Sequence, residues 1–237
     1  MASNVLQPLP PDFARTREGL HRLAEEVVKL AREHVTGEFS LIATSDGFGT
    51  PVFGPDDAQV RVEGGELLVA VGEEERREPI STLRAAAQLA AELLPEGLDL
   101  SDEPLGINSE ASRLLGRWYG FGEQVLEALR GEAGPTDEPT KPTLWPEHFD
   151  LAIEMGPDVE GSRANYGLSP GDENHDDPYL YMGPWSAKPQ GELWNAKGFS
   201  GAELAYAELA ASDDPAAMAL DFCRARKRAL EEMEFEG

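Results

Sequence analysis

Two pairs of short β-prone runs, each pair closed by a turn dipeptide, constrain the fold of this chain most strongly. The first pair lies in "GEFSLIATSDGFGTPVFG" around Asp46-Gly47, and the second lies in "AQVRVEGGELLVAVGEEERREPI" around Gly64-Gly65. Asp-Gly and Gly-Gly between apolar runs are typical of β-hairpins, because tight hairpin turns need positive φ angles that glycine adopts readily. Two consecutive hairpins predict an antiparallel sheet in the first half of the chain.

Helical patterns flank these hairpins. Apolar residues recur at helical spacing in "TREGLHRLAEEVVKLAREHV", residues 16–35, which predicts an amphipathic helix before the sheet. Two more helices are predicted after it, over residues 81–95 and 109–130, the second ending at Gly131. Three glycines interrupt that second helix at positions 116, 120 and 122. Glycine destabilises a helix interior, so we expect close packing or a kink there.

The second half repeats the theme of strands followed by helices. The runs "HFDLAIEM", "RANYGLS", "PYLYMGPW" and "GELWNA" predict a four-strand meander, and two helices follow it. Ser200 with Glu203 has the pattern of a capping box, and Asp214-Pro215 that of a helix start. The fold class is therefore α+β, with antiparallel sheets packed by amphipathic helices. We expect a first part over residues 1–131, a Pro-rich acidic linker over 132–143 and a second part over 144–237, the two parts packing as one unit.

Charge and cysteine content narrow the classes of function. The chain has 237 residues, of which 45 are acidic and 20 basic, giving a formal charge of −25. Such a field repels phosphates, so it disfavours binding to nucleic acid or anionic lipid and is compatible with a basic protein partner. Cys223 is the single cysteine, so no internal disulfide can form, and we expect it to be a buried helix residue. The start of the sequence does not resemble a signal peptide and no run is long enough to span a membrane, so we expect a cytoplasmic protein.

Two apparent catalytic motifs fail on inspection. "GLSPG", residues 167–171, matches the Gly-x-Ser-x-Gly nucleophile elbow, in which the residue after the serine donates its backbone N–H to the oxyanion. Here that residue is Pro170, which has no N–H. The glycines of "DGFGTPVFG" lack both the lysine and the spacing of a phosphate-binding loop. No catalytic residue is predicted.

An acidic loop is the candidate metal site. Asp172, Asn174 and Asp176 have the i, i+2, i+4 spacing of calcium ligands, but Gly183 stands where an EF-hand needs a glutamate, so an EF-hand is excluded. A looser divalent-cation site, for Ca²⁺, Mg²⁺, Mn²⁺ or Zn²⁺, would also use His175 and His148. The alternative is a solvated turn, since Asp, Asn, Gly and Pro are common turn residues.

The strand predicted over "EHFDLAIE" would place its acids near this loop. Alternation puts His148, Asp150 and Glu154 on one face of that strand. Asp150 and Glu154 would lie about 13 Å apart, which exceeds the roughly 5–9.5 Å of a glycosidase carboxylate pair. His148 with Asp150, or with His175, could still hold a metal or move a proton. We therefore expect the site between residues 172–177 and this strand face.

Aromatic residues with polar neighbours follow the acidic loop, and they could line a pocket for a small ligand. The candidate ligand-binding residues are Asn165, Tyr179, Tyr181, Trp185, Trp194 and Asn195.

Three segments of the second half carry a resemblance to a known family. They are "LWPEHFDLAIE", "NYGLSPGDENHDDPYLYMGPW" and "AELAYAELAASDDPAAMALDFCRARKRAL". In these the chain, over about residues 144–237, resembles an uncharacterised bacterial family that is catalogued only as a domain of unknown function. The resemblance implies an aromatic strand ending in "FDLA", an acidic segment leading into a second aromatic strand and a closing helix, and it implies no activity.

The sequence thus predicts an acidic module that binds a small ligand or a protein partner. One alternative is a metal-dependent hydrolase that uses the 172–177 loop. The other is an acidic protein that engages a basic partner through its charge. The first reading predicts an aromatic cleft, the second predicts oxygens and imidazoles converging on one ion, and the third predicts exposed apolar residues within an acidic surface.

Overall fold

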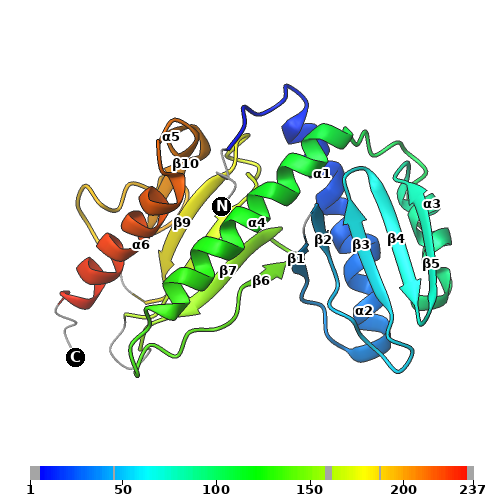
Figure 1. Ribbon diagram of the computed structural model, residues 1–237, viewed down its shortest axis with the longest axis horizontal. Coiled ribbons are helices and arrows are strands. Elements are labelled where there is room, and N and C mark those ends of the chain that lie inside the picture. Colours follow the sequence, from blue (N-terminus) through cyan, green and yellow to red (C-terminus); the bar gives the residue numbers. More distant parts are fainter. Residues whose placement is uncertain (1–5, 45, 158–161, 187, 234–237) are drawn as a thin grey trace. The chain divides into compact units, whose positions relative to one another are not determined.

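A computed structural model describes residues 6–44, 46–157, 162–186 and 188–233. It confirms the α+β class with two antiparallel five-stranded sheets, in the orders β1-β2-β3-β4-β5 and β10-β9-β8-β7-β6 (Figure 1). Both are meanders, because neighbouring strands in each sheet are also neighbours in the chain. Within the described ranges, no helix has the length and hydropathy needed to cross a membrane.

The chain divides into two compact units that differ from the predicted parts. One, here called the first-sheet unit, comprises residues 9–120 and 143–149; the other, the second-sheet unit, comprises residues 1–8, 121–142 and 150–237. The division falls inside helix α4 (Ser109–Gly131) and again just before strand β7. Residues 132–142, expected as a linker, therefore belong to the second-sheet unit.

The first-sheet unit begins with a long helix and continues with the predicted hairpins. Its elements are α1 (Phe13–Leu23), the π-helical turn η1 (Ala24–Val28), α2 (Lys29–Thr36), β1 (Ile42–Thr44), β2 (Gly47–Gly49), β3 (Gln59–Glu63), β4 (Glu66–Val71), β5 (Glu74–Pro79), α3 (Leu83–Leu89), the 3-10 turn η2 (Ala91–Leu93) and β6 (Thr143–Trp145). The β3–β4 turn has Gly64 at φ +64°, as the hairpin prediction requires. Strand β5 was not predicted, because all six of its residues are exposed and five are charged. It is an edge strand, where charged residues oppose pairing with other chains.

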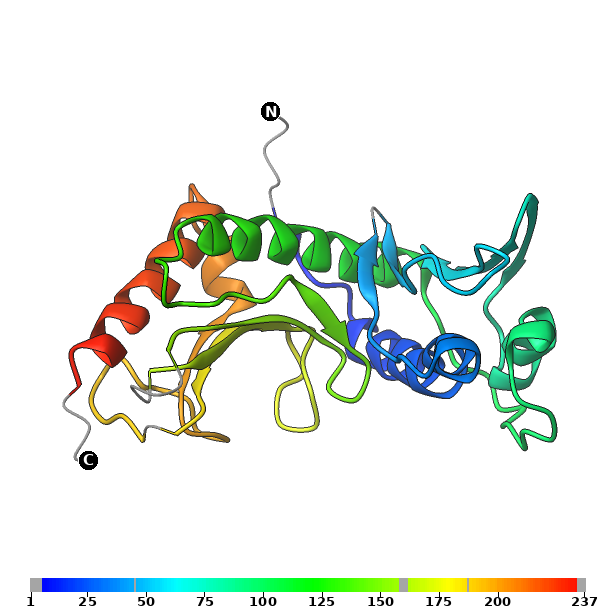
Figure 2. The ribbon, with the colours of Figure 1, turned by 90° about the horizontal axis from the view of Figure 1, so that it is seen from below.

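Burial of alternate residues gives the first sheet one apolar face. Phe48, Val62 and Leu67 are aligned across β2, β3 and β4, and all three are buried. Helix α1 and its continuation to α2 lie along this sheet in both views (Figures 1 and 2). Leu20, Leu23 and Val27 on that helix are fully buried. The apolar stripe seen in the sequence is thus the stripe that forms this core.

The second-sheet unit contains β7 (Asp150–Met155), β8 (Ala164–Ser169), β9 (Tyr179–Pro184), β10 (Ala202–Ala205), α5 (Tyr206–Ala210) and α6 (Pro215–Glu231). A row of four leucines crosses the sheet on one face, and all are buried: Leu151, Leu168, Leu180 and Leu204. The part of α4 that belongs to this unit lies over this face (Figure 2). A Cβ added at Gly122 of α4 would lie 3.0 Å from Leu168 and 3.3 Å from Leu151, so the glycine allows a close helix-to-sheet approach. This confirms at Gly122 the close packing expected from the glycines of α4, whereas a Cβ at Gly120 would have no atom within 4 Å.

Helix α6 begins as predicted, with Asp214 accepting a hydrogen bond from the Ala217 amide and Pro215 in the first turn. Cys223 is fully buried in this helix, which confirms its predicted position. Burial raises the pKa of its thiol to about 12, so at neutral pH it is not the thiolate that acts as a nucleophile.

Two predictions about the chain before α5 were wrong. "GELWNA", residues 191–196, is not a strand; the fourth long strand of the meander is instead β10. Glu203 therefore lies in a strand, and the helix that Ser200 was expected to cap begins only at Tyr206. The capping-box pattern misled because alanine-rich residues 202–205 have no alternation strong enough to distinguish a strand from a first helical turn.

Candidate functional site

The face of the second sheet opposite the leucine row carries polar and aromatic side chains. Side chains alternate along a strand, so Tyr179 and Tyr181 of β9 lie on this face while Leu180 and Met182 are buried on the other. Ser169 is paired with Tyr179, and Glu203 with Tyr181. Here we call this side of the sheet the polar face. Loop carboxylates from residues 172–177 add to it.

A buried carboxylate and a tyrosine form the centre of the polar face. Asp150, the first residue of β7, is only 6% exposed and accepts a hydrogen bond from the hydroxyl of Tyr181. Burial, followed by the charge of Asp150, raises the pKa of Tyr181 well above its usual value. A Cβ at Gly167, the cross-strand partner of Tyr181, would lie 2.5 Å from the tyrosine ring. Glycine at this position therefore lets the ring lie flat against β8 and reach Asp150.

The acidic loop closes on itself through the carboxylate of Asp172. One of its oxygens accepts hydrogen bonds from the backbone amides of Asn174 and His175, and the other accepts one from the hydroxyl of Tyr179 at 2.7 Å. The Asp172 amide in turn donates to the His175 carbonyl. Partial burial would raise the pKa of Asp172, but the hydrogen bonds from Tyr179, Asn174 and His175 outweigh it and lower the pKa below its usual value. Asp172 is therefore an ionised anchor of the turn.

His175 lies between two carboxylates. Its Nδ1 is 3.1 Å from Oδ1 of Asp172 and its Nε2 is 3.2 Å from Oε2 of Glu203. Its ring also contacts that of Tyr179, with the ring centroids 4.4 Å apart. Burial and the hydrogen bond to Asp172 raise the pKa of Tyr179, so its phenol stays protonated at neutral pH. A hydrogen bond between Nδ1 and the Asp172 carboxylate thus orients the imidazole, and the Glu203 carboxylate lies close to its other nitrogen.

A cleft of about 230 Å³ opens beside this histidine. Its walls come from the end of the acidic loop, the start of β9 and strand β10, and its lining residues are His175, Asp176, Asp177, Pro178, Tyr179, Glu203 and Ala205. The lining residues include three carboxylates and one tyrosine ring, and no lysine or arginine is among them. The cleft therefore combines hydrogen-bond acceptors, negative charge and an aromatic wall, which suits a small ligand that donates hydrogen bonds.

The predicted metal ligands are only partly brought together. Asp172 and His175 are in contact, but His148 is exposed in the turn of residues 146–149, so its predicted place on a strand face was wrong. Asn174 and Asp176 are exposed on the loop. Among the described residues, no three His, Cys, Asp or Glu side chains are arranged to hold a metal ion. The divalent-cation site stays a prediction from the sequence.

The predicted ligand-binding residues all lie in the second-sheet unit, and several contact one another. Tyr179 and Tyr181 have ring centroids 6.1 Å apart, and the indole N–H of Trp185 donates to Oδ1 of Asn165 at 2.7 Å. Asn195 instead holds the edge of the sheet, because its amide group bonds the backbone N–H and C=O of Glu203. Trp194 is half-buried in the same loop, where its amide donates to Gly191.

Sequence reasoning missed Glu203 and Ser169 as polar-face residues. The sequence predicts Glu203 as part of a helix cap, and it offers Ser169 only as the serine of a nucleophile elbow that Pro170 excludes. Ser169 is 4% exposed and its hydroxyl accepts a hydrogen bond from the Gly171 amide, so it supports the loop next to Tyr179. Alternation along "ANYGLS" could have placed Ser169 opposite the buried leucine, but the pairing of Glu203 depends on a strand that the sequence did not reveal.

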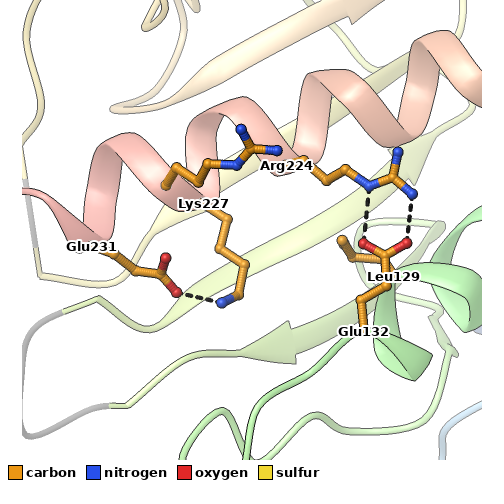
Figure 3. Close-up of a pocket in the computed structure, with 6 residues that line it drawn as sticks. Leu129, Glu132, Arg224, Lys227 and Glu231 are labelled. Carbon is orange, nitrogen blue, oxygen red and sulfur yellow. Dashed lines mark hydrogen bonds and ion pairs between the residues drawn. The ribbon is translucent and has the colours of Figure 1, made fainter.

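Two of the basic residues near the end of α6, Arg224 and Lys227, form ion pairs within the molecule. Arg224 forms a two-pronged ion pair with Glu132, and Lys227 contacts Glu231 (Figure 3). Lys227 also lies 3.1 Å from a carboxylate oxygen of Asp137. Arg226 bonds the Phe222 carbonyl and lies over the Phe222 ring. A groove of about 240 Å³ is lined by Arg224, Glu132, Lys227 and Glu231 together with Leu129 and Arg228. The ion pairs of Arg224 with Glu132 and of Lys227 with Asp137 attach α6 to the segment of residues 132–142 that follows α4.

Comparison with known proteins adds no assignment to this geometry. The proposed membership of an uncharacterised family, based on "LWPEHFDLAIE" and the segments that follow it, stays a prediction. No family model, no curated protein and no solved structure matches the chain.

Proposed function

We propose that this protein binds a small ligand carrying a protonated amine in the cleft beside His175. One observation carries the proposal: His175 is held between Asp172 and Glu203 at the wall of a cleft that is also lined by Tyr179. An ammonium group in this cleft would donate hydrogen bonds to carboxylates and make a favourable contact with the tyrosine ring. An anionic ligand would meet Asp176, Asp177 and Glu203 without a lysine or arginine among the lining residues.

Each lining group has a distinct part in this proposal. Glu203 is 22% exposed, so its carboxylate is partly desolvated and interacts more strongly than one at the open surface. The Glu203 carboxylate lies 3.2 Å from Nε2 of His175, at the wall of the cleft. Tyr179, kept neutral, provides an uncharged aromatic wall and holds Asp172 in place through its hydroxyl.

The test is ligand-dependent thermal stabilisation. Putrescine, agmatine and tyramine would be titrated as chloride salts at constant ionic strength, and at least one should raise the melting temperature in a saturable way, because only binding to the folded state stabilises it. Glu203→Gln should weaken this binding about tenfold or more, since it removes a partly buried charge from the ligand's surroundings.

A matched control separates the cleft from the overall charge. Glu192→Gln makes the same change in charge at an exposed loop position of the same unit. It should leave ligand binding unchanged. Stabilisation that is equal in the wild type, Glu203→Gln and Glu192→Gln would show nonspecific attraction to an acidic protein, and absence of saturable stabilisation with all three amines would refute the proposal.

A further inference from the structure

Trp185 is an exposed aromatic residue whose position is nonetheless fixed by three contacts. It is 49% exposed. Its indole N–H donates to Oδ1 of Asn165 at 2.7 Å, its backbone amide donates to the Arg163 carbonyl at 3.0 Å, and the Arg163 guanidinium lies 5.1 Å from the ring centroid. A tryptophan at the surface is normally free to change rotamer, so this ring is preorganised at a cost in side-chain entropy.

The arginine identifies which side of the ring is accessible. Arg163 is 13% exposed and is itself held by Glu154 at 3.2 Å and by the Gly156 carbonyl at 3.1 Å. The guanidinium therefore covers one face of the indole and is held there by these two contacts. Because Arg163 occupies one face of the ring and Trp185 is still 49% exposed, we take the other face as the one that a ligand can reach.

Polar groups with hydrogen-bonding capacity surround this ring. Glu154 and Asn165 are directly paired across β7 and β8 on the polar face. Asn165 contacts Trp185 through the oxygen of its side-chain amide. Glu154 contacts Arg163 through Oε2 of its carboxylate. A donor of Asn165 and an acceptor of Glu154 thus lie beside an exposed ring. The next residues, Ser186 and Lys188, are exposed and polar, which is unlike the apolar surroundings of a protein-binding anchor.

We propose that Trp185 is a stacking platform for a neutral sugar ring, with Asn165 and Glu154 bonding its hydroxyl groups. The C–H face of a pyranose can cover the indole while its edge carries hydroxyls that both donate and accept hydrogen bonds. A cationic ligand would be repelled by Arg163 on the other face of the ring, and an anionic one by the charge of −25. The amine cleft lies beyond the other end of β9, so this site does not depend on the function proposed above.

The indole resonances of the protein report on this site directly. The chain has four tryptophans, so a ¹H–¹⁵N spectrum contains four indole signals, and Trp185→Phe identifies the one from Trp185. Glucose, N-acetylglucosamine, cellotriose, chitotriose and maltotriose would each be titrated to about 20 mM, since a single stacked ring in an open site gives millimolar affinity. With at least one sugar, the signals of Trp185 and of the Asn165 side-chain amide should shift in a saturable way.

Variants then decide whether the platform is responsible. Trp185→Ala should weaken binding at least tenfold, Asn165→Ala should weaken it severalfold, and Leu193→Ala, at another exposed apolar position of the same unit, should leave it unchanged. A melting temperature close to that of the wild type checks that each variant is folded. No saturable shift with any of the five sugars, or equal affinity in Trp185→Ala, would overturn the proposal.

Discussion

Asp172 shows how a single carboxylate can organise a loop that the sequence presented as a metal site. Four groups surround it: the amides of Asn174 and His175, the His175 ring and the Tyr179 hydroxyl. Both oxygens are thereby engaged inside the protein. The i, i+2, i+4 spacing of Asp and Asn residues that suggests cation ligands also occurs in a turn whose first aspartate bonds the amides two and three residues ahead.

The lowered pKa of Asp172 predicts a pH-dependent contribution to stability. A group whose pKa is lower in the folded than in the unfolded state stabilises the fold above its ordinary pKa, near 3.8, and this contribution is lost as the pH falls through the lower folded value. Asp172→Asn should therefore reduce the free energy of unfolding by about 1–2 kcal/mol at pH 7, where charge-assisted hydrogen bonds are lost. In urea titrations from pH 7 to pH 2.5, the difference from the wild type should become smaller in acid.

Asp177→Asn is the control for this prediction. Asp177 is an exposed carboxylate of the same loop, so its replacement should change stability by less than about 0.5 kcal/mol. Equal effects of the two substitutions, or a gap between Asp172→Asn and the wild type that widens in acid, would contradict the assigned role of Asp172.

Among the secondary-structure elements, α4 is the one whose sequence looks least suited to its structure. It runs for 23 residues and contains Gly116, Gly120 and Gly122 in its interior. The three glycines have different surroundings. A Cβ at Gly116 would lie 2.4 Å from the backbone of Asp46 and Gly47, whereas a Cβ at Gly120 would have no atom within 4 Å. One glycine is therefore required by the packing of the β1–β2 hairpin, and the other is not.

This contrast predicts opposite effects of the same substitution. Gly116→Ala should destabilise the protein by about 2 kcal/mol or more, because backbone atoms must move to admit the methyl group. Gly120→Ala should stabilise it by about 0.5–1 kcal/mol, because alanine has the higher helix propensity and meets no obstacle. Chemical denaturation of both variants measures the two values, and destabilisation by Gly120→Ala would show that its surroundings are more crowded than described.

Prediction from the sequence succeeded where one local signal determined an element. The Gly64-Gly65 hairpin, the Asp214-Pro215 helix start and buried Cys223 each depend on local turn chemistry or helical periodicity. It failed where the environment decides: β5 forms from charged residues because it pairs with β4, and β10 forms because β9 offers an edge. The polar face could be anticipated in part, through Tyr179 and Tyr181. The contact between His175 and Glu203 depends on that unforeseen β10 strand.

At the scale of the whole molecule, the excess of acidic residues governs behaviour in solution. The charge of −25 makes like-charge repulsion a destabilising contribution to the compact state. Many individual acids are paired; for example, Arg61 and Arg77 form a network with Glu63 and Glu75 on the exposed side of the first sheet. Pairs of this kind offset only part of the repulsion, since 45 acids face 20 basic residues.

Added salt should therefore stabilise this protein. Raising NaCl from about 0.02 to 0.2 M shortens the screening length to below about 10 Å, so repulsion between distant carboxylates should weaken more than close ion pairs do. We expect the melting temperature to rise by several degrees, and KCl should give the same result because screening depends on ionic strength. A melting temperature that falls over this range would mean that ion pairs contribute more than the net charge.

Residues 132–142 bear on how this protein can change in evolution. The segment has the composition of a tether, yet Asp137 is buried and contacts Lys227. The Thr140 amide donates to the Glu154 carbonyl, and the Thr140 hydroxyl accepts a hydrogen bond from the Glu154 amide. A free tether tolerates insertions and deletions of almost any length. Here a change of a single residue would displace Asp137 from its lysine and shift the segment along β7. Homologous chains should therefore keep the length of this segment constant even where its proline and acidic residues are replaced.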